Sequence, residues 1–244
     1  MKVAITIAGL PRFTRDFDDF LEKLKDYDQV DWFFYLWNRP DDQFVPPNWP
    51  CNDVDAIRAK LLSNLPANHT IAYLDVHEMP VYNVTRPLNT TPWTSLPGVW
   101  YMYNGMKLVN EKREQYELQH GKYDLVIRSR GDISITREIS CRTAATYLQQ
   151  NPPSVLMPCD HRMGLQGRHV CEAFGIGTSD VMSVYSRLFD HLFEYNDQGC
   201  MYHPETLTAH HLTVSSILTP MTDFGFIFRN YNRPDWVLDW GRWN

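Results

Sequence analysis

The chain has 244 residues, a formal net charge of −6, 43% hydrophobic residues and 21% charged residues. These values are typical of a soluble globular protein, and the acidic balance argues against a protein whose main task is to grip a nucleic-acid backbone. The cysteines form no C-x-x-C pair, and they are Cys51, Cys141, Cys159, Cys171 and Cys200. This spacing indicates neither a disulfide framework nor a zinc cage, so we expect reduced thiols in a cytoplasmic protein.

Strands and helices are predicted to alternate along the chain. Short apolar runs predict strands at 3–8, 32–37, 71–76, 125–127, 155–157 and 173–177. Helical periodicity and capping residues predict helices near 17–24, 54–61, 101–120, 143–150, 179–193 and 205–218. No apolar run approaches the length of a membrane span. The alternation predicts one α/β domain over residues 1–244, with a mainly parallel central sheet and flanking helices.

Two further expectations come from this pass along the chain. The first helix would place Phe17, Phe20, Leu21 and Leu24 on one apolar face. The proline-rich stretch 77–97 is too long to be a simple connection, so we predict that it is a substrate loop.

The segment from Leu125 to Asp132 carries the strongest functional signal. A buried strand is followed at once by Arg128, Arg130, Gly131 and Asp132, at the carboxyl edge where α/β sheets bind ligands. A carboxylate beside guanidinium groups suits a metal ion that holds a phosphorylated ligand. The alternative is an aspartate that caps a turn while the arginines pair with surface acids.

A second group follows the first strand. Gly9 allows a close backbone approach, and Arg12 is placed to contact a nucleotide base or phosphate. The segment is neither a P-loop nor a G-x-G-x-x-G fingerprint, which argues against an NTPase or a dehydrogenase. Taken alone, it reads equally well as a bare turn.

Two acidic groups lie further along the chain. Glu172 precedes a short glycine-bearing strand, which suits a base that faces a ligand, although a surface acid reads equally well. His203 and Glu205 flank Pro204 at a helix start, with His210 on the same helix. Imidazole and carboxylate groups near each other can ligate a metal or handle a proton, and the alternative is a solvated helix start.

Several motifs occur in a fixed order along the chain. They are Ala8-Gly9-Leu10-Pro11-Arg12, Trp37, Tyr101-Met102-Tyr103-Asn104 with Asn110 and Tyr116-Glu117, Tyr123 through Asp132, Phe174 through Met182 with Tyr185-Ser186, and His203-Pro204-Glu205. In this order they resemble the GT-A-like glycosyltransferases of bacterial surface-polysaccharide clusters and large viruses. The resemblance covers most of the chain.

The resemblance implies a single GT-A-like, Rossmann-like domain that moves a sugar from a nucleotide-sugar donor of the UDP-sugar type to a hydroxyl acceptor. A glycan, a lipid-linked sugar, a protein or a hydroxylated base of viral DNA all fit as acceptors, and the net charge disfavours DNA. Two alternatives stay open. One is a metal-dependent nucleotidyltransferase or phosphoesterase, and the other is a non-catalytic nucleotide-sugar-binding protein.

The residues and the resemblance together give an expected site. The catalytic residues would be Glu172, as general base, and Asp132. The donor would be bound by Gly9, Arg12, Arg128, Arg130, His203 and Glu205. A divalent Mn or Mg ion would be held by Asp132, His203 and His210. The chain departs from the family twice, because Glu172 stands where an aspartate is usual and Asp132 replaces the two acids of a D-x-D motif with one.

Overall fold

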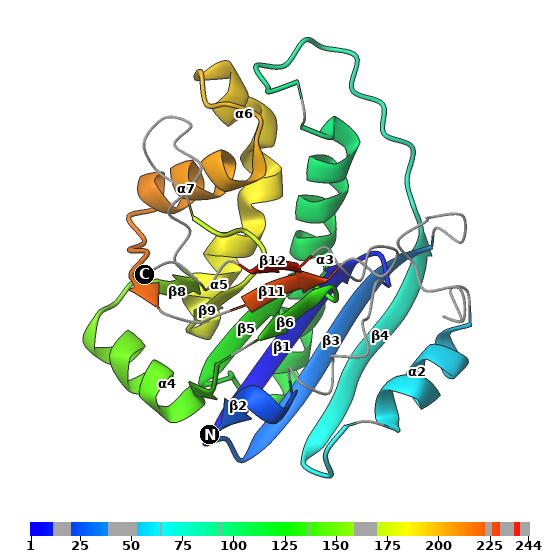
Figure 1. Ribbon diagram of the computed structural model, residues 1–244, viewed down its shortest axis with the longest axis vertical. Helices are drawn as coiled ribbons and strands as arrows, with labels where there is room; N and C mark the ends of the chain where they lie inside the picture. Colours follow the sequence, from blue (N-terminus) through cyan, green and yellow to red (C-terminus); the bar gives the residue numbers. More distant parts are fainter. Residues whose placement is uncertain are drawn as a thin grey trace.

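The computed structural model describes residues 1–11, 21–38, 53–63, 65–92, 94–135, 137–158, 170–222, 226–229 and 237–239. Within this part, a mostly parallel sheet lies between helices on both faces, as in Rossmann-like α/β proteins (Figure 1). None of the helices there combines the length and the apolar character that a membrane crossing would require.

The main sheet has seven strands in the order β10-β8-β9-β5-β1-β3-β4. Their bounds are β1 (Lys2–Gly9), β3 (Gln29–Asn38), β4 (His69–Glu78), β5 (Leu125–Ser129), β8 (Val155–Pro158), β9 (Gly175–Gly177) and β10 (Met221–Thr222). β1 runs parallel to both β3 and β5, and β3 runs parallel to β4. β9 runs antiparallel to both of its neighbours, β5 and β8. The segment that enters β9 therefore lies at the edge where β5 ends.

Each face of the sheet has its own hydrophobic core because side chains alternate along the strands. The helices are α2 (Val54–Leu62), α3 (Leu96–His120), α4 (Cys141–Gln150), α5 (Ser179–Ser186), the 3₁₀ helix η1 (Arg187–His191), α6 (Leu192–Asp197) and α7 (Pro204–Val214). Val3 and Ile5 of β1 belong to the core that α2 and α4 cover. Ala4 and the aromatic side chain of Phe33 belong to the core that α3, α5, α6 and α7 cover.

A smaller sheet continues directly from the end of β5. It consists of β6 (Ile133–Ile135), β11 (Phe226–Arg229) and β12 (Val237–Asp239), in the order β12-β11-β6. Because β6 begins immediately after Asp132, this residue occupies the short connection between the two sheets. Figure 1 shows the smaller sheet in front of the upper ends of β1 and β5.

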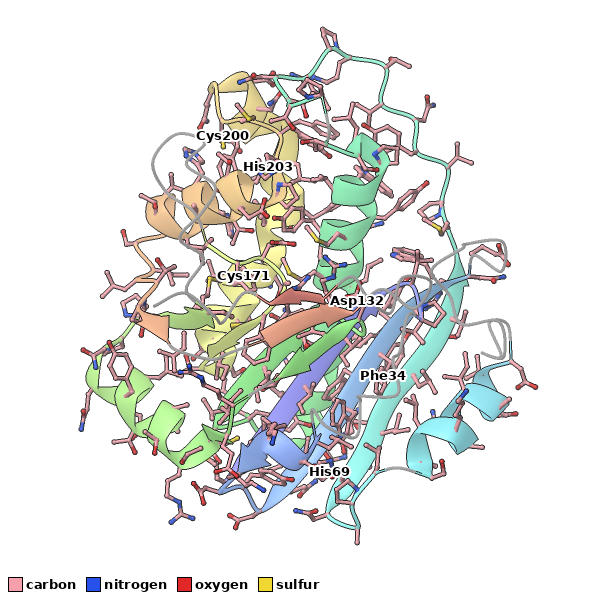
Figure 2. The ribbon with its side chains drawn as sticks, in the orientation of Figure 1. Phe34, His69, Asp132, Cys171, Cys200 and His203 are labelled. Atoms are coloured by element: carbon pink, nitrogen blue, oxygen red, sulfur yellow. The ribbon has the colours of Figure 1, made fainter. Side chains whose placement is uncertain are left out.

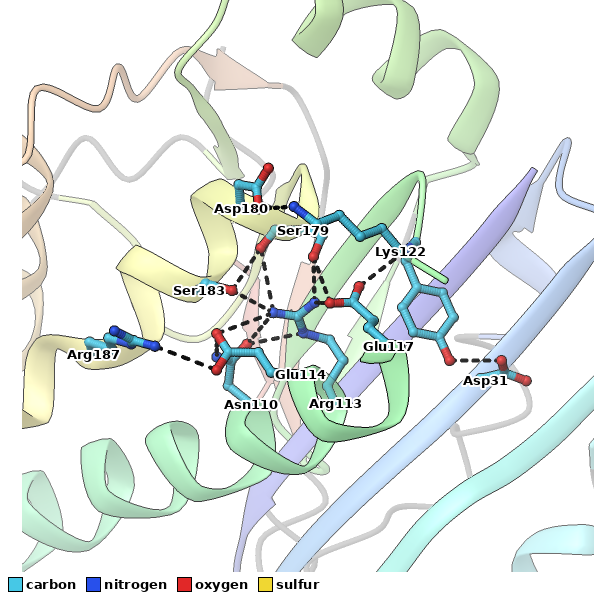
Figure 3. A network of polar contacts seen from close by, with 11 residues as sticks. Asp31, Asn110, Arg113, Glu114, Glu117, Lys122, Ser179, Asp180, Ser183 and Arg187 are labelled. Carbon is cyan, nitrogen blue, oxygen red and sulfur yellow. Dashed lines mark hydrogen bonds and ion pairs between the residues drawn. The ribbon is translucent and has the colours of Figure 1, made fainter. Parts of the chain in front are cut away.

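A buried polar network joins the long helix α3 to the start of α5 (Figure 3). The guanidinium of Arg113 is fully buried; it forms an ion pair with Glu117 at 2.7 Å and donates to Ser179 Oγ at 2.7 Å. It also donates to Ser183 Oγ and to Asn110 Oδ1, each at 2.8 Å. These bonds satisfy the buried guanidinium and fix the position of the helix that follows β9.

Most predicted elements are confirmed. The strands extend one to a few residues beyond their predicted ends, except that the strand predicted at 173–177 is shortened to β9. Three helix predictions are wrong in part. Residues 179–193 form α5, η1 and the beginning of α6 in place of one helix, although this stretch contains neither proline nor glycine. Leu24 does not continue a helix. It pairs with Ile139 in a small parallel sheet of β2 (Leu24–Lys25) and β7 (Ile139–Ser140), where its side chain is buried. The helix predicted to reach residue 218 ends at Val214.

Candidate functional site

The order of the strands reverses between β1 and β5. From β1 the chain proceeds through β3 to β4 on one side, and β5 then returns to the other side of β1. In open α/β sheets such a reversal creates a crevice at the carboxyl ends of the strands, where ligands bind. The register places Ile7 opposite Ser129, so Gly9 lies beside the segment from Arg130 to Asp132.

Gly9 ends β1 with a φ of +123°, a backbone conformation that side chains disfavour. The predicted close approach of a donor to the backbone of Gly9 stays a prediction. Arg12, the other donor-binding residue predicted here, lies outside the described residues.

Arg130 joins two acids at this edge. Its Nε donates to Asp132 Oδ1 at 2.9 Å and its Nη2 donates to Asp132 Oδ2 at 2.7 Å. Its Nη1 lies 3.6 Å from Glu172 Oε1. The structure thus brings together three predicted site residues that lie on segments about forty positions apart.

Arg128 holds the main chain of the same acid. It lies on β5 with its side chain buried, and its guanidinium donates to the carbonyl oxygen of Glu172. The hydroxyl of Tyr185 donates to the same carbonyl at 3.3 Å. Arg128 is therefore engaged with the backbone that positions Glu172, rather than open to a ligand.

His203 and Glu205 approach the cluster from the start of α7. His203 Nδ1 lies 2.7 Å from Glu205 Oε2, and this partner raises the pKa of His203 despite the opposing effect of burial. The fully buried Tyr103 of α3 donates to the carbonyl of Pro204 at 2.7 Å and fixes the first turn of the helix. Figure 2 labels Asp132 and His203 in the half of the molecule toward which β1 and β5 point.

Glu172 and Glu205 interact electrostatically. Burial raises the pKa of Glu172, and the charge of Glu205 raises it further. Arg130 and Arg128 act in the opposite direction, and the balance leaves the pKa of Glu172 above its ordinary value. The site therefore combines cationic groups with a carboxyl group that takes up a proton more readily than an exposed glutamate does.

His210 lies apart from these residues. Its ring packs edge-on against Tyr195 of α6, with ring centroids 4.7 Å apart. His210 is five positions beyond Glu205 along α7, which turns it by about 140° to a different face of the helix. Among the described residues, no group of three or more His, Cys, Asp or Glu side chains is arranged to hold a metal ion. The predicted set of Asp132, His203 and His210 is not brought together.

The stretch predicted as a substrate loop is irregular from Met79 to Ser95 in its described part, and it packs against the turn before α7. Tyr202 N donates to the carbonyl of Asn89 at 2.6 Å, and Thr90 Oγ1 donates to the carbonyl of Tyr202 at 3.1 Å. The loop thus contacts the residue next to His203. Its role in substrate binding stays a prediction.

Two residues of the site region were not predicted. Tyr103 and Tyr185 contact the backbone on either side of the acid cluster, yet each lies on a helix face that is otherwise apolar. A tyrosine in such a pattern is interpreted as a core residue. Only the hydrogen bond of its hydroxyl in the folded structure identifies it as part of the site region.

No protein-family model matches this chain, and no curated protein matches it in sequence.

Proposed function

We propose that the protein is a glycosyltransferase of the GT-A type, which transfers a sugar from a nucleotide-sugar donor to a hydroxyl acceptor. The observation that carries the proposal is the convergence of Arg130, Asp132 and Glu172, beside His203 and Glu205, at the point where the strand order reverses. A mostly parallel sheet with helices on both faces supports the same proposal, because this architecture binds nucleotides at that edge.

The reaction needs positive charge near the leaving diphosphate. Arg130 is a cation at neutral pH, and the raised pKa of His203 favours its charged form beside Glu205. The N-terminal turn of α7 presents further backbone N–H groups that His203 does not cap with its side chain. Such a helix start favours a phosphate group.

The reaction also needs a group that accepts the proton of the acceptor hydroxyl when configuration is inverted. Glu172 is the residue that we assign to this step, because its side chain lies at the ligand edge and its pKa is raised toward the working range of a general base. Arg128 and Tyr185 hold the backbone of Glu172, so the carboxyl group is oriented before the substrate arrives.

A panel of nucleotide-sugars tests the proposal. We expect one or more UDP-sugars to raise the melting temperature, because a ligand that binds only the native state stabilises it. The donor that stabilises the protein should also be consumed when a panel of hydroxyl acceptors is added, with release of nucleoside diphosphate detected by mass spectrometry. A matched variant, Arg130→Gln, should lose the stabilisation.

Two results would contradict the proposal. One is a melting temperature that no nucleotide-sugar raises. The other is turnover of nucleotides in which no acceptor ever gains a sugar, which would favour a phosphoesterase.

A further inference from the structure

The resemblance described above implies a divalent cation at Asp132, but both oxygens of this carboxylate already have a partner. Arg130 binds them with two parallel hydrogen bonds, at 2.9 Å and 2.7 Å. A fork-to-fork pair of this kind is the strongest geometry that an arginine and a carboxylate can form. A metal ion bound at Asp132 would have to compete for the same lone pairs.

The same guanidinium reaches the second acid of the site. Arg130 Nη1 lies 3.6 Å from Glu172 Oε1, so the cationic group lies between two carboxyl groups. The side chains of Asp132 and Glu172 are 15% and 9% exposed, whereas that of Arg130 is 29% exposed. The arginine is therefore the member of this trio that an incoming anion meets first.

Arg130 is held in its charged form. A guanidinium is charged at any working pH, and the carboxyl groups of Asp132 and Glu172 lie at 2.7 Å and 3.6 Å from it. The other predicted metal ligands have other partners, since His203 lies against Glu205 and His210 packs on Tyr195.

We infer that Arg130 supplies the positive charge at this edge of the sheet and binds the diphosphate of the donor directly. Asp132 then orients Arg130 instead of holding a metal ion. The inference rests on the proposed function, in which the donor carries a diphosphate. It adds the group that neutralises the charge of this diphosphate. Asp132 is then a positioning residue. Its carboxylate fixes the plane of the guanidinium and leaves Nη1 directed toward Glu172 and the ligand edge.

The binding of two diphosphates with and without metal tests this inference. Inorganic pyrophosphate and UDP are titrated into the protein by calorimetry, once in EDTA and once in excess MnCl₂. We expect the dissociation constants under the two conditions to agree within about twofold for each ligand. Arg130→Gln should weaken binding by about tenfold or more, equivalent to about 1.4 kcal/mol.

Three variants sharpen the result. Arg130→Lys keeps the charge but loses the planar fork, so it should not restore the affinity that Arg130→Gln loses. Asp132→Asn should weaken binding about threefold to tenfold, and by the same factor in EDTA and in MnCl₂. Arg187→Gln is the matched control. Arg187 lies on η1, pairs with Glu114 of α3 and is 61% exposed, so this variant should bind both diphosphates as tightly as the parent does. Circular dichroism confirms that each variant is folded.

The outcomes separate the two proposals. Binding that requires Mn²⁺ in the parent, together with loss of the Mn²⁺ effect in Asp132→Asn, overturns the inference and leaves the proposed function standing. Absence of binding to either diphosphate under both conditions overturns the proposed function, and the inference with it.

Discussion

The guanidinium of Arg128 donates a hydrogen bond to the main-chain carbonyl of Glu172, so a residue in the middle of the sheet holds the backbone of a residue at its edge. Arg128 is paired with Gly175 across β5 and β9. The bond connects β5 to the segment that enters β9. These two parts of the chain lie side by side because β9 runs antiparallel to β5.

Arg128→Met should destabilise the fold. Methionine preserves much of the buried volume but removes the donor, which leaves the carbonyl of Glu172 without its charged partner. We expect the free energy of unfolding in urea to fall by about 2 kcal/mol, the cost typical of losing a hydrogen bond to a charged group. Arg142→Met, at an exposed position on α4, is the control and should change the value by about 0.5 kcal/mol or less. Equal stabilities of the two variants would show that the Arg128 bond contributes nothing.

Glu172→Gln should abolish most of the transfer reaction while preserving the shape of the side chain. If Glu172 accepts the proton of the acceptor hydroxyl, turnover should fall by about 100-fold or more, because an amide cannot act as a base. Donor affinity, measured by calorimetry with the donor from the panel, should stay close to that of the parent. Normal turnover with an altered choice of donor sugar would instead assign Glu172 to sugar recognition.

Arg113→Leu should be among the most damaging single substitutions in the described part of the chain. It leaves the carboxylate of Glu117 and the hydroxyl of Ser179 buried without their cation (Figure 3). We expect a loss of about 3–5 kcal/mol in the free energy of unfolding. Lys122→Met breaks the neighbouring ion pair between Lys122 and Asp180, whose side chains are 65% and 79% exposed, and should change the free energy of unfolding far less. Similar losses in the two variants would argue against a special role for the buried network.

His69 predicts a dependence of stability on pH. Its Nδ1 accepts a hydrogen bond from Trp32 Nε1 at 3.1 Å, so the proton of the neutral ring is on Nε2, which donates to Tyr27 at 3.0 Å. Burial lowers the pKa of His69 to about 4. The folded state therefore disfavours the protonated ring. The resulting stability is fully present above the unfolded pKa of about 6.5 and is lost as the pH falls toward 4.

The measurement compares the parent with His69→Gln, whose amide oxygen can still accept the bond from Trp32. Between pH 7.5 and pH 4, the parent should lose about 2 kcal/mol more than the variant, after allowance for partial solvation of the ring. A difference between the two proteins that stays constant across this range would contradict the prediction.

The main elements could be predicted because the sheet strands are continuous apolar runs. Leu125 to Ile127 is buried on both faces, which is why this short run was recognisable without any alternation. The candidate site followed from the same reasoning, since residues after a buried parallel strand meet at one edge. Glu172 and Arg130 were each named as site residues, and they lie 3.6 Å apart although the antiparallel direction of β9 was not predicted.

The remaining features depend on contacts that are distant in sequence. Leu24 has the spacing of a helical residue, but its pairing with Ile139, more than a hundred positions away, determines its structure. His210 lies on a face of α7 that packs against Tyr195, away from His203. The histidine-rich pattern at 203–211 does not show that these two histidines lie apart. The pairing of Arg130 with Asp132 was equally hidden, because the sequence shows two nearby charges without showing which atoms meet.

The packing of the three residues of β9 limits where the carboxyl group of Glu172 can lie. A Cβ atom at Gly177 would lie 2.9 Å from Met182, and one at Gly175 would lie 3.2 Å from Val155, so Ile176 fits opposite Ile127 in one register only. The distance that the acid at position 172 extends beyond the sheet is therefore set by the number of residues between it and Gly175. Ala173 and Phe174 in this connection are buried in the core, so the carboxyl group cannot be moved relative to the sheet without repacking the side chains that anchor it.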